Sequence, residues 1–252
     1  MSDRVMALIP ARGGSKGIPR KNLLMIAGKP LIAYTILQAL AATRINRVIV
    51  STDDEEIARV SREWGAEVPF VRPSQFAGDH SPDIDVFRHA LEWLAQTEGY
   101  QPEMVVHLRP TCPMRRIDLI DGAIASLADR PDADAVRSVS HAALSPYKMW
   151  RIDTQGNLNP LLTIDGVTDS QSLPRQQLPQ VYWQNGYVDV LRPRAVLDKN
   201  SMWGTCAIPL LIEDPVLELD YAENIPEIEE AIRRSESGIP LNHGAVRERH
   251  AV

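Results

Sequence analysis

Short runs of β-branched and other apolar residues alternate along the chain with longer segments in which apolar residues recur every three or four positions. The short runs predict strands, and the longer segments predict helices. The expected strands are Val5–Ile9, Arg47–Thr52, Glu67–Val71, Met104–Leu108 and Ala135–Val139. The expected helices are Pro30–Ala42, Asp54–Trp64, Pro82–Thr97 and Ile117–Ala128. This alternation is typical of βαβ units and predicts an α/β fold, with a mainly parallel sheet flanked by helices.

Residues that favour helix ends lie at the expected boundaries. Pro30 and Pro82 fit the first turns of their helices, and Ser81 is expected to be an N-cap. Gly65 follows the second helix at the position where a left-handed residue commonly ends a helix. These residues support the predicted helix limits.

The alternation stops after Ser140. Residues 141–185 are rich in Pro, Gln, Asn and Asp, show no clear period, and are too long for an ordinary connection. We expect this segment to form a small structure of its own or to contact another subunit. Strand-like runs return at Gly186–Leu191 and Thr205–Ile212, and Pro226–Arg234 resembles a final helix. The predicted organisation is an α/β domain of residues 1–140 and 186–237, an excursion of residues 141–185, and a polar tail of residues 238–252.

Composition narrows the class of protein. The 252 residues carry a formal net charge of −6 without a block of basic residues, which argues against a nucleic-acid partner. Neither a leader peptide nor a membrane-spanning apolar stretch is recognisable, so no membrane partner is expected. Cys112 and Cys206 have neither zinc-site nor disulfide-framework spacing. We therefore expect a soluble cytoplasmic protein.

The most informative segment is the loop that follows the first expected strand. It combines three glycines with four cations: Gly13, Gly14, Gly17, Arg12, Lys16, Arg20 and Lys21. Backbone N–H groups in a glycine loop let a phosphate approach closely, and the cations neutralise its charge. Because the loop follows a strand of a parallel sheet, it is expected at the edge where such sheets bind ligands. It fits neither the P-loop pattern nor the dinucleotide fingerprint.

Other candidate residues have simpler interpretations. His107 lies within an apolar run and is expected to be a core histidine with its hydrogen bonds satisfied. Cys112 has no base nearby in the sequence, so a nucleophilic role is not supported. Asp53 follows a strand and has two equally good interpretations, as part of a nucleotide site or as the cap of the next helix.

Several motifs together resemble one family. The segment Ile-Pro-Ala-Arg-Gly-Gly-Ser-Lys-Gly-Ile-Pro-Arg-Lys-Asn-Leu, residues 9–23, is similar to the signature of the acylneuraminate cytidylyltransferases, or CMP-sialic acid synthetases. The resemblance continues at residues 28–32, 51–58, 72–73, 109–115, 175–179 and 185–186. It implies a Rossmann-like nucleotidyltransferase fold and a reaction of CTP with a 2-keto-3-deoxy sugar acid. The anomeric hydroxyl would attack the α-phosphorus in line, giving a CMP-sugar and pyrophosphate.

The resemblance also implies roles for individual residues. Arg12 and Lys21 would be catalytic, stabilising charge on the α-phosphate and on the departing pyrophosphate. The nucleotide would be bound by Ala11, Arg12, Gly13, Ser15, Lys21, Asn22, Arg72 and Ser81. Mg²⁺ would be the cofactor, held by carboxylates late in the chain. Glu218 and Asp220 are preferred as its ligands because alternation in a strand would place both on one face; Asp214 is the alternative.

The acceptor sugar would contact Arg109, Lys148, Arg175 and Trp203. Lys148 and Arg175 would reach over from a partner subunit, because this family dimerises through the region of residues 141–185. A homodimer or a dimer of such dimers is expected. The family commonly has Gln at the position of Arg109, so the acceptor is expected to be a nonulosonic acid that need not be N-acetylneuraminate.

Three alternatives stay open at this stage. The same chemistry on 3-deoxy-manno-octulosonate is one, although no acid follows His107 as that branch would require. A relative that uses GTP or another nucleotide is the second. A non-catalytic nucleotide-binding scaffold is the third, since fold alone does not establish function.

Overall fold

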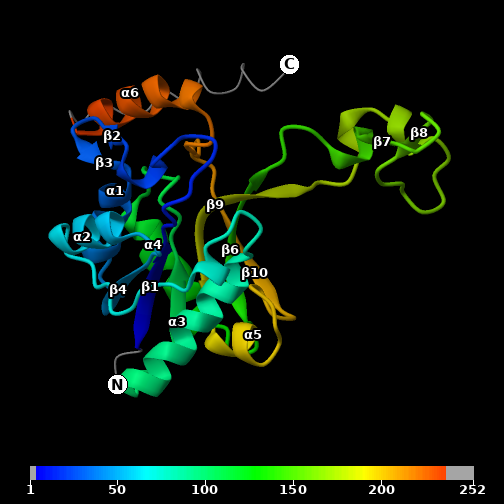
Figure 1. Ribbon diagram of the computed structural model, residues 1–252. Helices are drawn as coiled ribbons and strands as arrows, with labels where there is room; N and C mark the ends of the chain where they lie inside the picture. The colour runs from blue at the N-terminus through cyan, green and yellow to red at the C-terminus, as the bar shows by residue number, and fades with distance from the viewer. Residues whose placement is uncertain (1–3, 237–252) are drawn as a thin grey trace.

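A six-stranded mixed sheet forms the centre of the computed structural model, which describes residues 4–236 (Figure 1). Its strands lie in the order β10-β6-β9-β5-β1-β4. Their bounds are β1 Val5–Pro10, β4 Arg47–Ser51, β5 Met104–His107, β6 Ala135–His141, β9 Tyr182–Leu191 and β10 Ala207–Leu211. Strand β9 is antiparallel to both of its neighbours, and the other neighbouring pairs are parallel. The prediction of a mainly parallel sheet is confirmed.

Helices cover both faces of this sheet. Alternate β1 residues point to opposite faces. Ala7 and Ile9 pack with helices α1 Leu31–Ala41, α2 Glu55–Glu63 and α4 Ile117–Ala128. On the other face, Met6 and Leu8 pack with α3 Asp83–Glu98 and α5 Pro193–Leu197. The layered helix–sheet–helix architecture therefore follows from the period-two pattern of the strands.

A smaller apolar cluster covers one end of the domain. Helix α6 Ile225–Glu236 packs over the hairpin of β2 Met25–Ile26 and β3 Lys29–Pro30. The buried residue Leu219 belongs to the same cluster. This cluster fixes the segment before α6 against the region that follows the glycine loop.

The structure corrects three local predictions. Residues Glu67–Val71 do not form a strand; Glu67 makes one isolated parallel bridge with Ile49. Ser81 is not an N-cap, because Pro82 occupies that position and the Ser81 hydroxyl contacts the loop before it. Pro30, like Pro82, precedes its helix by one residue. Gly65 does follow α2 with a φ of 96°, as expected for a residue after a helix end.

The chain between β6 and β9 projects as an arm away from the sheet (Figure 1). It carries a hairpin formed by β7 Trp150–Ile152 and β8 Leu158–Pro160, and several short 3₁₀ turns. Large apolar side chains on it are exposed, including Ile152 and Leu158. Strand β9 begins four residues before the predicted run, so the base of the arm continues the sheet. The predicted tail of residues 238–252 lies outside the described residues.

Candidate active site

The glycine loop leaves the sheet at the carboxyl end of β1. The buried residue Ala11 continues the strand pairing, with its N–H donating to the Ser51 carbonyl at 2.9 Å. The Gly13 N–H donates to Asp53 Oδ1 at 3.0 Å, and a Cβ at Gly13 would lie only 2.7 Å from Asp54 Oδ2. Asp54, not Asp53, caps α2 by accepting from the Ile57 N–H. Asp53 therefore holds the loop, so its interpretation as the helix cap is wrong, and its role in a nucleotide site stays a prediction.

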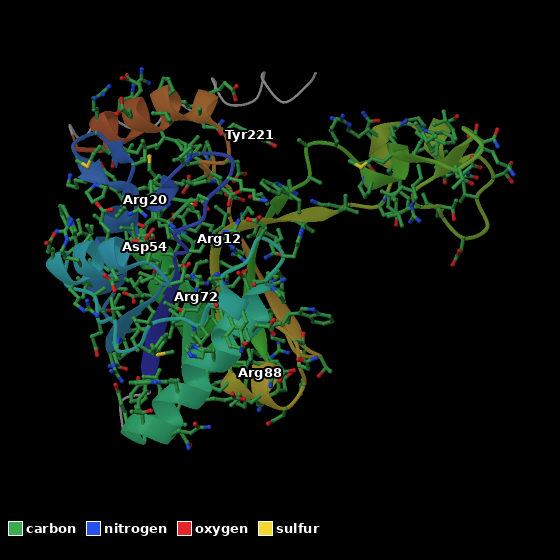
Figure 2. The ribbon with its side chains drawn as sticks, in the orientation of Figure 1. Arg12, Arg20, Asp54, Arg72, Arg88 and Tyr221 are labelled. Carbon is green, nitrogen blue, oxygen red and sulfur yellow. The ribbon has the colours of Figure 1, made fainter. Side chains whose placement is uncertain are left out.

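Arg20 fixes the far end of the same loop. Its guanidinium pairs with Asp54 and with Glu56 at the start of α2. Figure 2 labels Arg20 and Asp54 in the whole molecule. The pKa of Asp54 lies below its usual range. Burial alone would raise this pKa, but the hydrogen bond from the Ile57 N–H and the contact with Arg20 together lower it by more. Arg20 is thus a structural ion-pair partner, whereas Arg12 and Lys21 point elsewhere.

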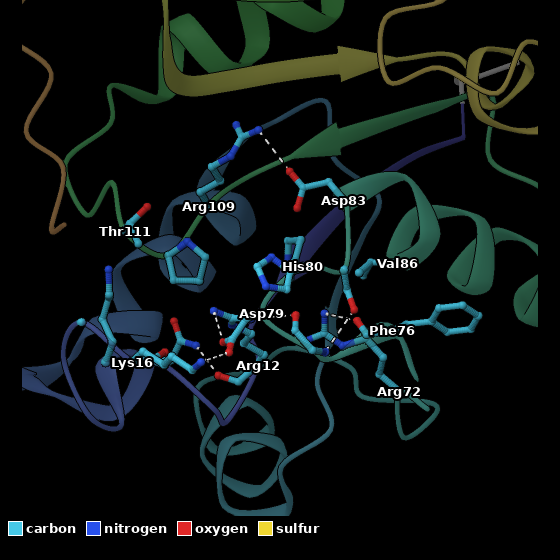
Figure 3. Close-up of a pocket in the computed structure, with 18 of the residues that line it drawn as sticks. Arg12, Lys16, Arg72, Phe76, Asp79, His80, Asp83, Val86, Arg109 and Thr111 are labelled. Carbon is cyan, nitrogen blue, oxygen red and sulfur yellow. Dashed lines mark hydrogen bonds and ion pairs between the residues drawn. The ribbon is translucent and has the colours of Figure 1, made fainter. Parts of the chain in front are cut away.

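A cavity of about 570 Å³ opens beside this loop at the carboxyl edge of the sheet (Figure 3). Seven residues predicted for the site line it: Arg12, Ser15, Lys21, Asn22, Arg72, Ser81 and Arg109. Ala11 and Gly13 form the loop backbone next to it. The structure therefore brings the predicted nucleotide residues together around one hollow.

Asp79 forms ion pairs with two cations at the mouth of this cavity. Its carboxylate lies 3.2 Å from Arg12 Nη2 and also pairs with Lys16, and Arg12 Nη1 donates to the Gly78 carbonyl at 2.7 Å (Figure 3). The contact with Lys16 lowers the pKa of Asp79. The glycine loop and the loop of residues 74–81 are thus held together by a carboxylate where the cations converge.

Arg72 is the least satisfied cation of the cavity. The residue is 4% exposed, and neither Nε nor Nη2 has a hydrogen-bond partner among the described residues. Its Nη1 donates weakly to the Phe76 carbonyl at 3.4 Å, and Asp53 Oδ1 lies 3.9 Å from Nη2. Burial lowers the pKa of Arg72. A buried guanidinium with unused donors is suited to an anionic or carbonyl-bearing ligand.

Lys21 links the cavity to the acidic segment before α6. Its Nζ donates to the Leu219 carbonyl at 2.8 Å and lies 4.0 Å from Asp220 Oδ1. The Leu219 N–H donates to the carbonyl of Thr111, a cavity residue, at 2.7 Å. Desolvation lowers the pKa of Lys21, although Asp220 and Glu218 oppose the shift. Burial, and then the charge of Asp220, raise the pKa of Glu218.

The two acids were expected on one face of a strand, and this is wrong. Strand β10 ends at Leu211, and residues 212–220 form no regular secondary structure. The carboxylates of Glu218 and Asp220 still interact through their charges, and Leu219 between them is buried in the apolar cluster. The alternative ligand, Asp214, pairs instead with Arg116 at 3.1 Å. Among residues 4–236, no group of three or more His, Cys, Asp or Glu side chains is arranged to hold a metal ion.

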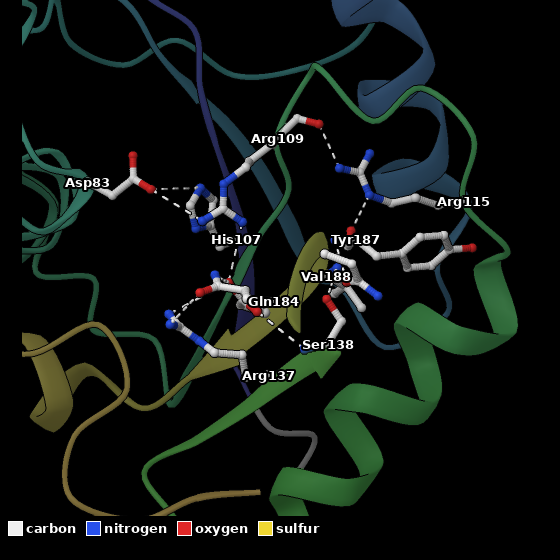
Figure 4. A network of polar contacts seen from close by, with 11 residues as sticks. Asp83, His107, Arg109, Arg115, Arg137, Ser138, Gln184, Tyr187 and Val188 are labelled. Atoms are coloured by element: carbon white, nitrogen blue, oxygen red, sulfur yellow. Dashed lines mark hydrogen bonds and ion pairs between the residues drawn. The ribbon is translucent and has the colours of Figure 1, made fainter. Parts of the chain in front are cut away.

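Arg109 belongs to a network that the sequence did not indicate (Figure 4). Its Nη2 lies 3.3 Å from Asp83 Oδ2, and its Nη1 lies 3.4 Å from Oδ2 of the buried Asp189. Asp189 also accepts from the Ser138 N–H at 3.3 Å, where the register of β6 against β9 shifts. A bulge commonly redirects a side chain beside a functional site. Arg109 therefore forms structural ion pairs and also lines the cavity.

Arg115 is a buried residue that sequence reasoning missed. It donates to the carbonyls of Arg109, Cys112 and Tyr187, and to the Thr35 hydroxyl. Burial lowers its pKa. These contacts fix the loop of residues 109–115 and thereby the position of Arg109. Burial raises the pKa of the Cys112 thiol, which agrees with its non-nucleophilic interpretation.

Three predicted sugar-binding residues lie away from this cavity. Lys148 and Arg175 are exposed on the arm, where Lys148 Nζ donates to the Gln171 carbonyl at 3.0 Å. Trp203 is 49% exposed and precedes β10, at the opposite edge of the sheet. The structure does not bring these three side chains to the cavity of their own chain.

Comparison with known proteins agrees with this geometry. The sequence profile described as "Cytidylyltransferase" matches residues 6–155. The CMP-N,N'-diacetyllegionaminic acid synthase of Legionella pneumophila is 34% identical over 210 residues, which cover 83% of this chain and 87% of that protein. The chain belongs to the cytidylyltransferase family. The predicted resemblance is confirmed, and the protein is a nucleotidyltransferase of the acylneuraminate cytidylyltransferase type.

One further relative and one solved structure also resemble this chain. The pseudaminic acid cytidylyltransferase of Campylobacter jejuni is 41% identical over 118 residues, covering 47% of this chain and 50% of that protein. Among solved structures, CMP:2-keto-3-deoxy-manno-octonic acid synthetase complexed with CTP has a TM-score of 0.66 at 18% identity. That alignment covers 92% of this chain and all of the other, and it supports the nucleotidyltransferase fold. None of the helices described here is both long and apolar enough to cross a membrane.

Proposed function

We propose that this cytidylyltransferase joins CTP to a nonulosonic acid, giving a CMP-sugar and pyrophosphate. The observation that carries the proposal is the cavity at the carboxyl edge, where the glycine loop, Arg12, Lys21 and the unsatisfied Arg72 converge. Relatives named for legionaminic, pseudaminic and acylneuraminic acids support an acceptor of this class. Because CTP is a cytoplasmic nucleotide, the proposal places the reaction in the cytoplasm.

In this proposal the reaction depends on positioning and charge. The anomeric hydroxyl attacks the α-phosphorus in line, and pyrophosphate leaves. Arg12 and Lys21 are the catalytic residues and stabilise charge on the α-phosphate and the leaving group. The loop backbone at Ala11, Gly13 and Ser15, with Asn22, Arg72 and Ser81, binds the nucleotide. Asn22 is 7% exposed and its amide donates to the Arg12 carbonyl at 3.0 Å, so it also fixes the loop.

Glu218 and Asp220 fit the chemistry of a Mg²⁺ site. Mg²⁺ is usually bound by one or two carboxylates together with substrate phosphates, so a complete protein cage is not needed. Burial, and then the charge of Asp220, raise the pKa of Glu218, and a divalent cation would relieve the repulsion between the two carboxylates. When bound, Mg²⁺ would neutralise phosphate charge. Lys21, whose Nζ lies 4.0 Å from Asp220 Oδ1, would also bind the phosphates.

We also propose that the arm completes the sugar site across a homodimer, or within a dimer of such dimers. Lys148 and Arg175 are exposed on the arm, away from their own cavity, and the same arm carries exposed apolar side chains. An arm of this kind can reach the cavity of a second copy. Trp203, at the opposite sheet edge, is not part of the proposed sugar site of its own chain.

The test is to supply Mg²⁺, CTP and a panel of nonulosonic acids, and to follow pyrophosphate release. Product with legionaminic-, pseudaminic- or sialic-type acids supports the proposal. Product only with 3-deoxy-manno-octulosonate, or only with GTP, would replace the substrate assignment. No pyrophosphate with any pair, while CTP still binds, would favour a non-catalytic scaffold.

A further inference from the structure

His107 ends strand β5 beneath the cavity and is poorly explained as a core residue. Its side chain is fully buried, packs edge-on against the Phe87 ring at 4.7 Å, and lines the cavity. Neither Nδ1 nor Nε2 has a hydrogen-bond partner among the described residues. The sequence interpretation as a satisfied core histidine is therefore correct about burial and wrong about hydrogen bonding.

This arrangement costs stability unless a ligand uses it. A buried polar group without a partner typically costs about 1–3 kcal/mol, and an aliphatic side chain would fill the same space without that cost. Burial, assisted by the charges of Arg109, Arg115 and Arg137, holds the pKa of His107 well below its usual range. The ring is therefore neutral, with one nitrogen that donates and one that accepts.

The surroundings of His107 differ from the phosphate-binding end of the cavity. Asp83 Oδ2 lies 3.9 Å from His107 Nε2 and 3.3 Å from Arg109 Nη2, and the Asp83 side chain is 44% exposed (Figure 4). His107, Asp83 and Arg109 are called the His107 group. The neutral His107 ring offers one donor and one acceptor, and the Asp83 carboxylate is a second acceptor. Arg109 is a cation already shared between the carboxylates of Asp83 and Asp189. A phosphate would be repelled by Asp83, whereas a hydroxyl or secondary amide both donates and accepts.

The position of Arg109 indicates which substrate lies here. A Cβ on Gly186 would lie 2.6 Å from Glu218 Oε1 and 3.7 Å from Arg109 Cδ, so Arg109 borders the acidic segment. Arg72 and Ser81 belong to the chain segment before α3, among the proposed nucleotide residues. Because Asp83 pairs with Arg109, the predicted sugar contact, the His107 group adjoins the proposed acceptor side of the cavity; Asp83 also acts electrostatically on Arg72, so the group borders the proposed nucleotide residues.

We propose that His107, together with Asp83, binds an uncharged polar substituent of the acceptor sugar, a hydroxyl or an acylamino group, and so helps determine which nonulosonic acid is used. This inference rests on the proposed function and names a specificity-determining residue within it.

The experiment compares His107→Leu, which cannot hydrogen-bond, with His107→Gln, which keeps a donor and an acceptor. Steady-state kinetics are measured with the acid that the wild-type protein uses best, and with analogues that each lack one hydroxyl or acylamino group. We expect His107→Leu to lower kcat/KM for the full acid about 10-fold or more, as loss of one well-made hydrogen bond does, with the KM for CTP changed less than about twofold. The loss should disappear for the one analogue that lacks the contacted group, and His107→Gln should restore part of the activity.

Tyr100→Phe is the matched control. It removes a buried hydroxyl that has no hydrogen-bond partner within residues 4–236, and Tyr100 does not line the cavity. It should leave sugar kinetics unchanged. Equal losses with every analogue would mean a structural role for His107, and a changed preference between CTP and UTP would place it on the nucleobase; either result overturns the inference. If His107→Leu does not fold, the analogue series with His107→Gln decides in the same way. Absence of turnover by the wild-type protein would instead count against the proposed function and remove the basis of the inference.

Discussion

Substitution of Arg72 should separate effects on CTP binding from effects on folding stability. Arg72→Met keeps the length of the buried side chain and removes the guanidinium. In the part of the chain that the structure describes, its Nε and Nη2 have no hydrogen-bond partner, and Nη1 makes only the 3.4 Å contact with the Phe76 carbonyl. Hydrogen bonds to a charged group contribute about 1.5–3 kcal/mol each. With the lower value for two donors, loss of Arg72 should weaken CTP binding by about 3 kcal/mol, or about 10²-fold in Kd.

The same substitution should leave the free energy of unfolding of the ligand-free protein unchanged or higher, because it removes buried donors that have no hydrogen-bond partner among the described residues, and the ion pair lost with Asp53 is a long one of 3.9 Å. Isothermal titration calorimetry with CTP and Mg²⁺ measures the first effect, and urea denaturation measures the second. Arg88→Met is the control, since Arg88 donates to the Val196 carbonyl at 2.9 Å and to Asn200 Oδ1 at 2.7 Å, away from the cavity. It should lower stability and leave the Kd for CTP unchanged. The reasoning is refuted if Arg72→Met destabilises the ligand-free protein as Arg88→Met does, or if its Kd for CTP changes less than threefold.

Three further results are expected. Arg12→Ala should lower kcat about 10²-fold or more, as loss of transition-state charge stabilisation does, and an unchanged kcat would remove Arg12 from catalysis. Asp220→Asn should raise the Mg²⁺ concentration needed for half-maximal activity, whereas Asp214→Asn should not, because Asp214 pairs with Arg116; the reverse order would move the metal site. Asp134→Asn should cost about 3 kcal/mol of stability at pH 7, because the buried Asp134 carboxylate accepts from Lys199, Arg194 and the Thr205 N–H. Burial alone would raise the pKa of Asp134, but these hydrogen bonds lower it below the usual range. The contribution of Asp134 to the free energy of unfolding is therefore present above about pH 4, the pKa of an unfolded Asp, and is lost as pH falls through the lower pKa of the folded state. Urea denaturation should accordingly show that the free energy of unfolding of the variant falls less on acidification than that of the wild-type protein.

Elements with strong local signals could be predicted from the sequence. Both ends of α4 agree with the expected range Ile117–Ala128, since apolar periodicity continues up to each end. The glycine loop was placed correctly because it directly follows a buried strand. The strand predicted at Glu67–Val71 failed because Val68 and Phe70, two residues apart, are buried in two different clusters and not on one face. Only Glu67 pairs with the neighbouring strand β4, through its bridge to Ile49.

The parts of the site that depend on distant residues could not be predicted. Nothing local to His107 indicates that its ring nitrogens lack partners, because that depends on α3 and on the cavity. Arg109 is 80 residues from Asp189, the carboxylate that holds it. The antiparallel orientation of β9 likewise reflects the return of the chain from the arm, which no periodicity in residues 186–191 records.

Asp79 has a consequence for how nucleotide binding responds to salt. Arg12 and Lys16 already share this carboxylate, so they retain fewer counter-ions from the solvent than two free cations would. A triphosphate that takes the place of Asp79 would exchange one anion for another and release few chloride ions. Affinity for the nucleotide should accordingly fall less steeply with added potassium chloride than the number of positive side chains in the cavity suggests.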